Sequence, residues 1–282
     1  MNSLFILGTP IGNLRDITLR ALETLESVHL ILAEDTRTTR KLLSAYGLKT
    51  RLLSYNEQNH QRRLPGIMKT LESADVALVS EAGMPRLSDP GTELVIEAIN
   101  KGGISISTIP GPSALTAAVS LASFQANEFT YLGFLPRIKA KRAHTLASIK
   151  NQERPTVIFE SPHRLRKTLQ DLLAVLGNRH MTICREMTKF HEETYHGSLS
   201  DALATFISPR GEFTLIIDAV GSPMATMTQA EALDEINRLS NLGVSPSKAV
   251  AQTVRNTDLS RRELYSKWLD KFRDPLDGSF PH

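Results

Sequence analysis

Short apolar runs alternate with longer segments of helical periodicity up to about residue 125. The apolar runs have the length and the flanking turn signals of strands, and they cover residues 3–8, 29–35, 75–80 and 104–109. The segments between them repeat apolar residues every three or four positions, as amphipathic helices do, and they cover residues 16–28, 36–47, 92–103 and 110–123. This alternation predicts a parallel sheet with helices on both faces.

A second series of the same kind begins near residue 125. Its expected strands cover residues 129–136, 155–160, 181–186 and 212–220, and its expected helices cover residues 142–150, 161–177 and 198–207. We therefore predict an N-terminal α/β domain over residues 1–125 and a second α/β domain over residues 126–222.

The remaining tail, residues 223–282, has a different pattern. It contains two capping-box signatures, Thr228 with Glu231 and Ser260 with Glu263, and a helix start at Ser245-Pro246. These signals predict a small C-terminal segment of three short helices.

Composition narrows the class of protein. A chain of 282 residues with 41% apolar residues can bury a core in each of two domains. Its single cysteine, Cys184, excludes a disulfide framework and is expected in the core. The first apolar run is too short for a signal peptide or a membrane span, and Pro10 interrupts it. We therefore expect a cytoplasmic protein with no membrane segment.

Three loops rich in glycine and proline follow predicted strands of the first domain. They are GTPIGN (8–13), VSEAGMPRLSDPG (79–91) and PGPSA (110–114). Loops at the carboxyl ends of strands bind ligands in open α/β sheets, so we expect these three to form one site. The loop 79–91 has another interpretation, as a long turn that caps the helix starting near Thr92. No dinucleotide or P-loop fingerprint occurs, which argues against phosphate cradling.

Seven motifs also occur in a characteristic order: LFILGTPIGNLRDITLRALETL, AEDTRTTRKLL, VSEAGMPRLSDPG, PGPSA, FESPHR, CREMTKFHEE and GEFTLII. These motifs and their order resemble those of the tetrapyrrole methylase superfamily and, within it, of the branch that acts on ribosomal RNA. The resemblance covers residues 3 to 221 and is looser over the tail. It implies an α/β, two-domain fold with the cofactor, S-adenosyl-L-methionine, in the interdomain cleft, and a homodimer.

The resemblance also implies an activity. Members of this branch methylate the ribose 2′-hydroxyl of a cytidine, cytidine 1402 by family, in 16S rRNA of the small ribosomal subunit. By family position, the cofactor-binding residues are Pro10, Gly83, Met84, Leu87, Ser113, Ala114, Phe159, Phe213 and Thr214. The sequence departs from the branch at Glu81, where Asp is common, and at Met84, where Thr is common. Contacts made through the backbone tolerate both changes.

A ribose hydroxyl is a weak nucleophile, so a positioned base would speed its methylation. Acidic candidates near strand ends are Glu34, Asp35, Glu81, Glu160 and Glu186. Our first candidate for a catalytic residue is Glu160, followed by Glu186 and Lys189. A competing interpretation of Glu160 is a structural ion pair with Arg164.

Basic residues are concentrated in one segment of the second domain. Between Phe129 and Lys167 there are nine Lys or Arg residues and two acidic residues. The stretch RIKAKR (137–142) is expected to be a flexible basic loop over the cleft, with Arg137, Lys139, Lys141 and Arg142 binding RNA phosphates. Solvated surface charge is the other interpretation of this segment.

The sequence has three further interpretations besides an RNA methyltransferase. The stretch HEETYH (191–196) resembles a zinc-protease motif, but its histidines are five positions apart instead of four, so no metal site is expected. A non-catalytic RNA-binding protein could use the tail as a helix-turn-helix, although residues 225–282 hold eight basic and eight acidic side chains. A small-molecule tetrapyrrole methylase is the other alternative.

Overall fold

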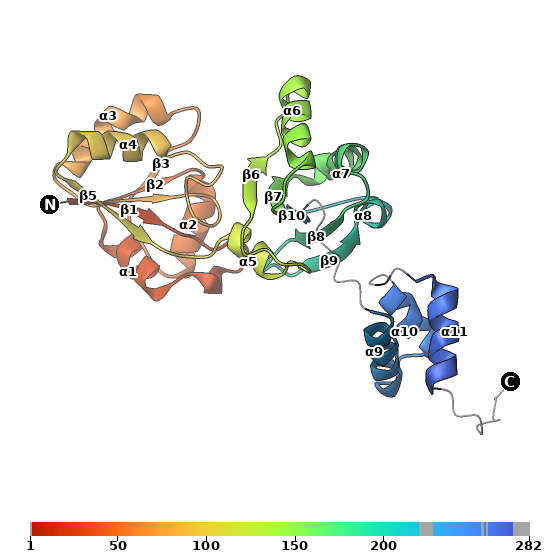
Figure 1. Cartoon of the computed structure of the whole chain (residues 1–282). Coiled ribbons are helices and arrows are strands. Elements are labelled where there is room, and N and C mark those ends of the chain that lie inside the picture. Colours follow the sequence, from red (N-terminus) through yellow and green to blue (C-terminus); the bar gives the residue numbers. More distant parts are fainter. Residues whose placement is uncertain (1, 220–227, 255–256, 258, 273–282) are drawn as a thin grey trace. The chain divides into compact units, whose positions relative to one another are not determined.

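The computed structural model describes residues 2–219, 228–254, 257 and 259–272. The chain divides into two compact units, residues 1–219 and residues 220–282. The first unit contains two five-stranded sheets, and the second contains helices (Figure 1).

The first sheet is fully parallel, as predicted. Its strands are β1 (Asn2–Leu7), β2 (Leu30–Ala33), β3 (Leu52–Ser54), β4 (Val76–Val79) and β5 (Ile104–Ile109), in the order β3-β2-β4-β1-β5. Every residue of β2 and of β4 is buried, because helices cover both faces.

Each face of this sheet has its own helices and its own core. Helices α1 (Leu19–Ser27) and α2 (Thr36–Ala45) pack on one face, and α3 (His60–Leu71) and α4 (Thr92–Lys101) pack on the other (Figure 1). The side chains of Thr18 and Asp35 cap the N-termini of α1 and α2. A 3₁₀ helix, η1 (Leu14–Asp16), precedes α1.

The second sheet is mixed. Its strands are β6 (Thr130–Phe134), β7 (Thr156–Glu160), β8 (His180–Arg185), β9 (Glu193–Ser198) and β10 (Phe213–Ile217), in the order β6-β7-β10-β8-β9. Only β6 and β7 pair in parallel, and the other three pairs are antiparallel. Helices α6 (Lys139–Lys150), α7 (Pro162–Leu176) and α8 (Leu199–Thr205) contribute to the core on one face.

The opposite face of the second sheet meets the first part of the chain. Val157, Cys184 and Ile216 pack there against Ile11 and against helix α5 (Ala114–Ser120). The helix that our domain prediction assigns to residues 1–125 thus packs on the second sheet. Cys184 is buried, as expected, and burial raises the pKa of its thiol to about 11.

Several elements differ from expectation. The basic stretch 137–142 is not a flexible loop, because α6 begins at Lys139 and includes most of it. Strand β9 occupies the segment that resembles a zinc motif. Strand β3 and helix α3 lie between residues 48 and 74, where the sequence pattern predicts no element.

The C-terminal unit contains the three helices predicted for it. They are α9 (Gln229–Asn241), α10 (Pro246–Thr253) and α11 (Arg261–Phe272), which share one small apolar core. Thr228 and Glu231 form a capping box, and Ser260 and Glu263 bond in the same reciprocal way. Within the described part of the chain, no helix combines the length and the hydropathy that a membrane crossing requires.

Candidate functional site

The three loops of the first sheet converge, as their positions predict. Thr9 and Gly83 exchange backbone hydrogen bonds, with Thr9 N donating to Gly83 O at 2.9 Å and Gly83 N donating to Thr9 O at 3.0 Å. The third loop touches the first, since a Cβ added at Gly111 would lie 2.9 Å from the Gly8 oxygen. Only glycine permits this approach, so the glycines bring the loops after β1, β4 and β5 together.

The second loop has a strained backbone and reaches the second sheet. Gly83, Arg86 and Ser88 all have positive φ values, of 79°, 74° and 74°. Such strain in non-glycine residues often marks functional sites. The Ser88 hydroxyl bonds to the Tyr131 hydroxyl on β6 at 2.8 Å. This contact joins the loops of the first sheet to the second.

A cavity of about 290 Å³ opens between these loops and the second sheet. From the first sheet it is lined by the loop after β1, the start of α2 and the residues after β4, and from the second by Lys189 and Glu212. Its polar lining side chains are Thr9, Thr38, Thr39, Ser80, Glu81, Lys189 and Glu212. The volume is at the lower end of the range of small-molecule sites.

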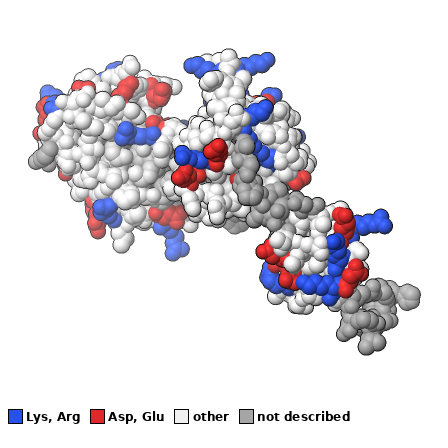
Figure 2. Space-filling view, in the orientation of Figure 1, with Lys and Arg blue, Asp and Glu red and all other residues white. Residues whose placement is uncertain are grey.

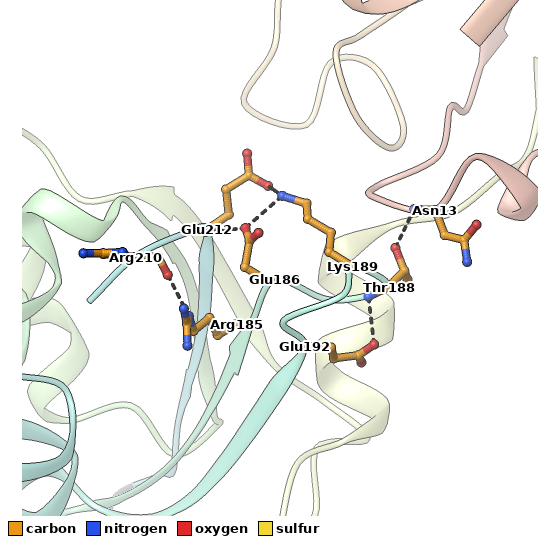
Figure 3. A network of polar contacts seen from close by, with 8 residues as sticks. All are labelled: Asn13, Arg185, Glu186, Thr188, Lys189, Glu192, Arg210 and Glu212. Carbon is orange, nitrogen blue, oxygen red and sulfur yellow. Dashed lines mark hydrogen bonds and ion pairs between the residues drawn. The ribbon is translucent and has the colours of Figure 1, made fainter. Parts of the chain in front are cut away.

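Lys189 enters the cavity from the loop between β8 and β9, residues 186–192, which we call the hairpin loop. Its ammonium donates to Glu186 Oε1 and to Glu212 Oε2, both at 2.9 Å, and Glu212 N also donates to Glu186 Oε1 at 2.9 Å (Figure 3). Burial lowers the pKa of Lys189, but the hydrogen bonds to the two carboxylates and their negative charges raise it by more, so the pKa is higher than its ordinary value. Burial raises the pKa of Glu186, but hydrogen bonds from Lys189 and from Glu212 N lower it overall. Glu186 and Lys189 therefore remain charged at neutral pH.

The hairpin loop contacts the first loop of the site closely and is hydrogen-bonded to it. Asn13 N donates to Thr188 Oγ1 at 3.0 Å, and Thr188 N donates to Glu192 Oε2 at 2.9 Å (Figure 3). A Cβ added at Gly12 would lie only 2.5 Å from Lys189 Cγ and 2.7 Å from Thr188 Oγ1. These contacts fix Lys189 relative to the first sheet.

Acidic side chains gather where β2 and β4 end. Burial raises the pKa of Asp89 to about 7, and the charges of Glu34 and Glu81 contribute, against a hydrogen bond from Ser80. Burial also raises the pKa of Glu34, again with Glu81 adding to the shift. Repulsion among these carboxylates contributes to both shifts, and a cationic ligand beside them would relieve it.

Most predicted cofactor-binding residues lie around these loops. Pro10 lines the cavity. Gly83 lies against the third loop, where an added Cβ would be 3.5 Å from the Pro112 oxygen and 4.0 Å from Ser113 Cα. Ser113 and Ala114 begin α5 at that contact. Met84 packs against Gly8, and the Leu87 side chain is 40% exposed.

The residues predicted on the second sheet divide between its two faces. Thr214 pairs with Phe159 and with Cys184, so all three share the face that carries α5. The Phe159 ring lies 5.2 Å from that of Tyr131. Phe213 is one position away, and its side chain is buried in the core on the opposite face. Only the backbone of Phe213 can face the cofactor loops.

Glu160 has the surroundings of a structural residue. It is 2% exposed and faces α7, where Oε1 accepts from Ser161 N at 2.8 Å and Oε2 accepts from the Thr168 hydroxyl at 2.6 Å. Arg164 Nε lies 3.4 Å from Oε1. The geometry thus argues against Glu160 as our first catalytic candidate and supports the competing ion pair. Glu186 and Lys189, by contrast, are brought together at the cavity.

Sequence reasoning missed other cavity residues. Glu81 is one of five acidic candidates, and Glu212 belongs to the segment GEFT (211–214) that the family resemblance places at the cofactor, whereas Thr38 and Thr39 are not among the candidates. A signal existed for each, since Glu81 and Glu212 stand next to strand ends inside quoted motifs. The threonines belong to the motif AEDTRTTRKLL.

The predicted RNA-binding residues separate in the same way. Arg137, Lys139 and Lys141 are exposed, and Lys and Arg side chains are visible over α6 in Figure 2. Arg142 instead donates to Asp171 Oδ2 at 2.9 Å and to Thr168 Oγ1 at 2.8 Å, and its side chain is 13% exposed. Arg142 therefore joins α6 to α7 and is poorly placed to bind phosphate.

Among the described residues, no group of three or more His, Cys, Asp or Glu side chains is arranged to hold a metal ion. In the segment that resembles a zinc motif, His196 Nδ1 lies 3.2 Å from the Thr182 hydroxyl.

Comparison with solved structures identifies the fold. The chain is similar to diphthine synthase, with a TM-score of 0.60 and 14% identity, over 78% of this chain and 90% of that one. It is also similar to uroporphyrin-III C-methyltransferase from Thermus thermophilus, with a TM-score of 0.56 and 17% identity, over 77% and 94% of the two chains.

Sequence comparison identifies the family. Residues 3–203 match the model of tetrapyrrole (corrin/porphyrin) methylases. The ribosomal RNA small subunit methyltransferase I of Thermotoga maritima is 50% identical over 77% of this chain and 98% of its own. The protein of that name from Halalkalibacterium halodurans is 40% identical over 94% and 93%. The chain therefore belongs to the tetrapyrrole methylase family, in the group that contains the ribosomal RNA small subunit methyltransferases I.

Proposed function

We propose that this chain is an S-adenosylmethionine-dependent methyltransferase that modifies 16S rRNA in the small ribosomal subunit. Its acceptor is the ribose 2′-hydroxyl of a cytidine, cytidine 1402 by family. The observation that carries the proposal is 40% identity, over 94% of the chain, to a relative named for methylation of small-subunit ribosomal RNA.

Methyltransferases of this kind in the family use S-adenosylmethionine, which supplies a methyl group on a positively charged sulfur. The site fits such a ligand, because its glycines permit close approach of backbone groups and a cation would relieve the repulsion among its clustered carboxyl groups. We assign binding to side chains or backbone at the predicted positions Pro10, Gly83, Met84, Leu87, Ser113, Ala114, Phe159 and Thr214. Phe213 contributes its backbone alone.

Methyl transfer from sulfur to oxygen requires the three reacting atoms to be in line, so holding the RNA ribose in place supplies much of the rate. The hydrogen bond from Asn13 N to Thr188 Oγ1 holds the two walls of the cavity in a fixed relative position, as this alignment requires. Lys189 remains protonated between Glu186 and Glu212, and these two ion pairs hold its side chain at the cavity.

The hydroxyl must lose a proton as its oxygen gains the methyl group. Glu160 is turned away from the cavity, whereas Glu81 is one of the residues that line it. We assign to Glu81 the role of accepting this proton and passing it to solvent. Glu186 is occupied by two hydrogen bonds and serves to position Lys189.

The exposed cations Arg137, Lys139 and Lys141 extend the RNA contact along α6. As the family resemblance implies, the working form is a homodimer in the cytoplasm. Sedimentation of the purified protein tests the dimer, and imaging of the tagged full-length chain in cells tests the location.

The decisive experiment supplies the purified chain with S-adenosylmethionine labelled in its methyl group and with small ribosomal subunits that lack the modification. Nuclease mapping then locates the label. We expect label at a single 2′-O-methylcytidine in 16S rRNA. Measurable cofactor binding without label on RNA would refute the proposal, and small-molecule tetrapyrroles would then be the acceptors to test. Binding of RNA without any cofactor affinity would instead indicate a non-catalytic RNA-binding protein.

A further inference from the structure

Phe190 exposes almost its whole side chain. Phe190 is 96% exposed, more than any other large apolar residue that the structure describes. His191 packs edge to face against it, with 5.0 Å between ring centroids and 81° between ring planes. One flat face of an aromatic ring is thus open to solvent.

The backbone that presents this ring is held in place. In the hairpin loop, Glu186 and Thr188 have positive φ values of 49° and 65°. Glu186 N donates to Glu212 O at 3.0 Å, Lys189 N donates to Glu186 O at 3.0 Å, and Glu192 N donates to Lys189 O at 3.1 Å. The bond from Asn13 fixes the loop to the first sheet as well. A loop with a strained, hydrogen-bonded backbone that carries an exposed aromatic ring is typical of a preorganised binding site.

The ring also belongs to a loop that contributes to the cavity. Phe190 directly follows Lys189, which lines the cavity and lies against Gly12. The hairpin loop is therefore the part of the second sheet along which a molecule too large for the cavity can extend to Phe190.

A nucleotide within an RNA strand is part of a molecule that is large enough to extend beyond the cavity. For its 2′-hydroxyl to enter the cavity, the ribose must leave a stacked strand, and the bases on either side lose stacking partners. Proteins that bind unstacked RNA replace this loss by stacking bases on aromatic side chains.

We propose that Phe190 is a stacking platform for a nucleobase of the RNA substrate beside the methylated nucleotide. His191 sets the orientation of the ring. The inference rests on the proposed function, since it requires an RNA acceptor, and it names the residue that positions that RNA.

A protein partner fits this surface less well. Specific protein interfaces bury on the order of 1,000 Å² or more around a core with few charged residues. Phe190 is a single ring between Lys189 and the acidic residues Glu192 and Glu193. An isolated ring with charged neighbours is suited to one flat ligand.

The test compares four variants of the full chain on small ribosomal subunits that lack the modification. Phe190→Ala removes the ring, Phe190→Leu keeps an apolar side chain without a flat face, and Phe190→Trp enlarges the face. Ile207→Ala is the matched control, because it deletes another exposed apolar side chain of the second domain.

We expect the Ala and Leu variants to raise KM for subunits by about tenfold, as the loss of one base stack implies, with kcat, cofactor affinity and Tm unchanged. The Trp variant should retain the wild-type KM or lower it, and the control should match wild type. Unchanged KM in the Ala variant would overturn the inference. So would a dimer that dissociates in this variant when measured by sedimentation, since the ring would then belong to an interface between copies. If the wild-type chain itself puts no label on RNA, the proposed function fails first, and the two failures are thereby distinguished.

Discussion

Glu81 and Glu160 both stand near the carboxyl end of a strand, yet their side chains have different surroundings. Glu160 is enclosed by Ser161 N, Thr168 and Arg164, while Glu81 lines the cavity near the carboxyl groups of Glu34 and Asp89. A carboxylate with every oxygen bonded inside the fold stabilises that fold. A carboxylate at a cavity wall is available to a substrate.

Glu81→Gln keeps the size of the side chain and removes its ability to take a proton. We expect kcat for RNA methylation to fall by about 10²–10⁴-fold, the usual contribution of a positioned base, with the Tm unchanged. Single-turnover rates on unmodified small subunits measure this. A rate within a few-fold of wild type would assign the proton to another acceptor.

Glu160→Gln should have the opposite profile. The neutral amide loses the attraction of Arg164 and accepts one hydrogen bond fewer, so we expect the free energy of unfolding to fall by about 1–3 kcal/mol. Urea denaturation measures this, and kcat of the folded enzyme should stay near wild type. Glu153→Gln, at an exposed position, is the control and should change stability by less than about 0.5 kcal/mol. A large loss of kcat at full stability would restore Glu160 as a catalytic residue.

Asp89 should make stability depend on pH. Its pKa is about 7 in the folded chain against an ordinary value of 3.8, so between these values the folded state holds a proton that the unfolded state has released. The stability of the wild type therefore declines as pH rises from about 4 to about 7, and this contribution is constant above that window.

The asparagine of the Asp89→Asn variant carries no charge at any pH, so the stability of this variant does not decline for that reason. Its advantage over wild type should grow across the same window, to about 1–2 kcal/mol after allowance for solvent screening. Urea denaturation of both proteins at several pH values from 5 to 8 measures the difference, in which other titrating groups cancel. A difference that does not vary with pH would show that Asp89 titrates normally.

Part of this residue-scale account could be read from the sequence. Alternation along PTVIFE puts Ile158 and Glu160 on one face and Val157 and Phe159 on the other, and the same period separates Phe213 from Thr214. Which face meets the first domain depends on α5, and the sequence pattern does not place α5 on the second sheet. Proximity to a strand end makes Glu160 a candidate, but it does not show on which face of the sheet the side chain lies.

At the scale of elements, the close contact between the first loop and the hairpin loop depends on Gly12. Gly12→Ala would drive a methyl group into Lys189, Thr188 and the Met187 carbonyl, so we expect a loss of about 1–3 kcal/mol in stability and weaker cofactor binding. Denaturation and calorimetric titration with S-adenosylmethionine measure the two effects.

Gly66→Ala provides the matched control for this contact. Gly66 lies inside α3 with no atom within 4 Å of an added Cβ, so the same substitution there should raise stability by about 0.5–1 kcal/mol. If both variants behave alike, the contact at Gly12 has no special role.

The elements themselves were predictable where their apolar patterns were strong. The buried strands β2 and β4 have continuous apolar runs, and the capping boxes located the C-terminal helices. Strand β9 was missed because ETYHGS has no apolar run, as is usual for an edge strand with one partner. The start of α6 differs from the predicted loop because the basic residues of this stretch have good helix propensity.

At the scale of the whole molecule, net charge is only +3, so RNA binding depends on where the cations stand. Replacing Arg137, Lys139 and Lys141 by Gln removes three exposed charges of the α6 region. We expect weaker binding to small subunits, and a slope of log K against log salt that is smaller by about 2–3, since each phosphate contact contributes about 0.7–0.9. Replacing Arg20, Lys49 and Arg51 of the first domain by Gln changes net charge equally and is the control. Filter binding at 50–200 mM salt, a range in which such contacts weaken strongly, separates the two sets. If both variants lose the same slope, the RNA responds to overall charge and α6 is no specific contact.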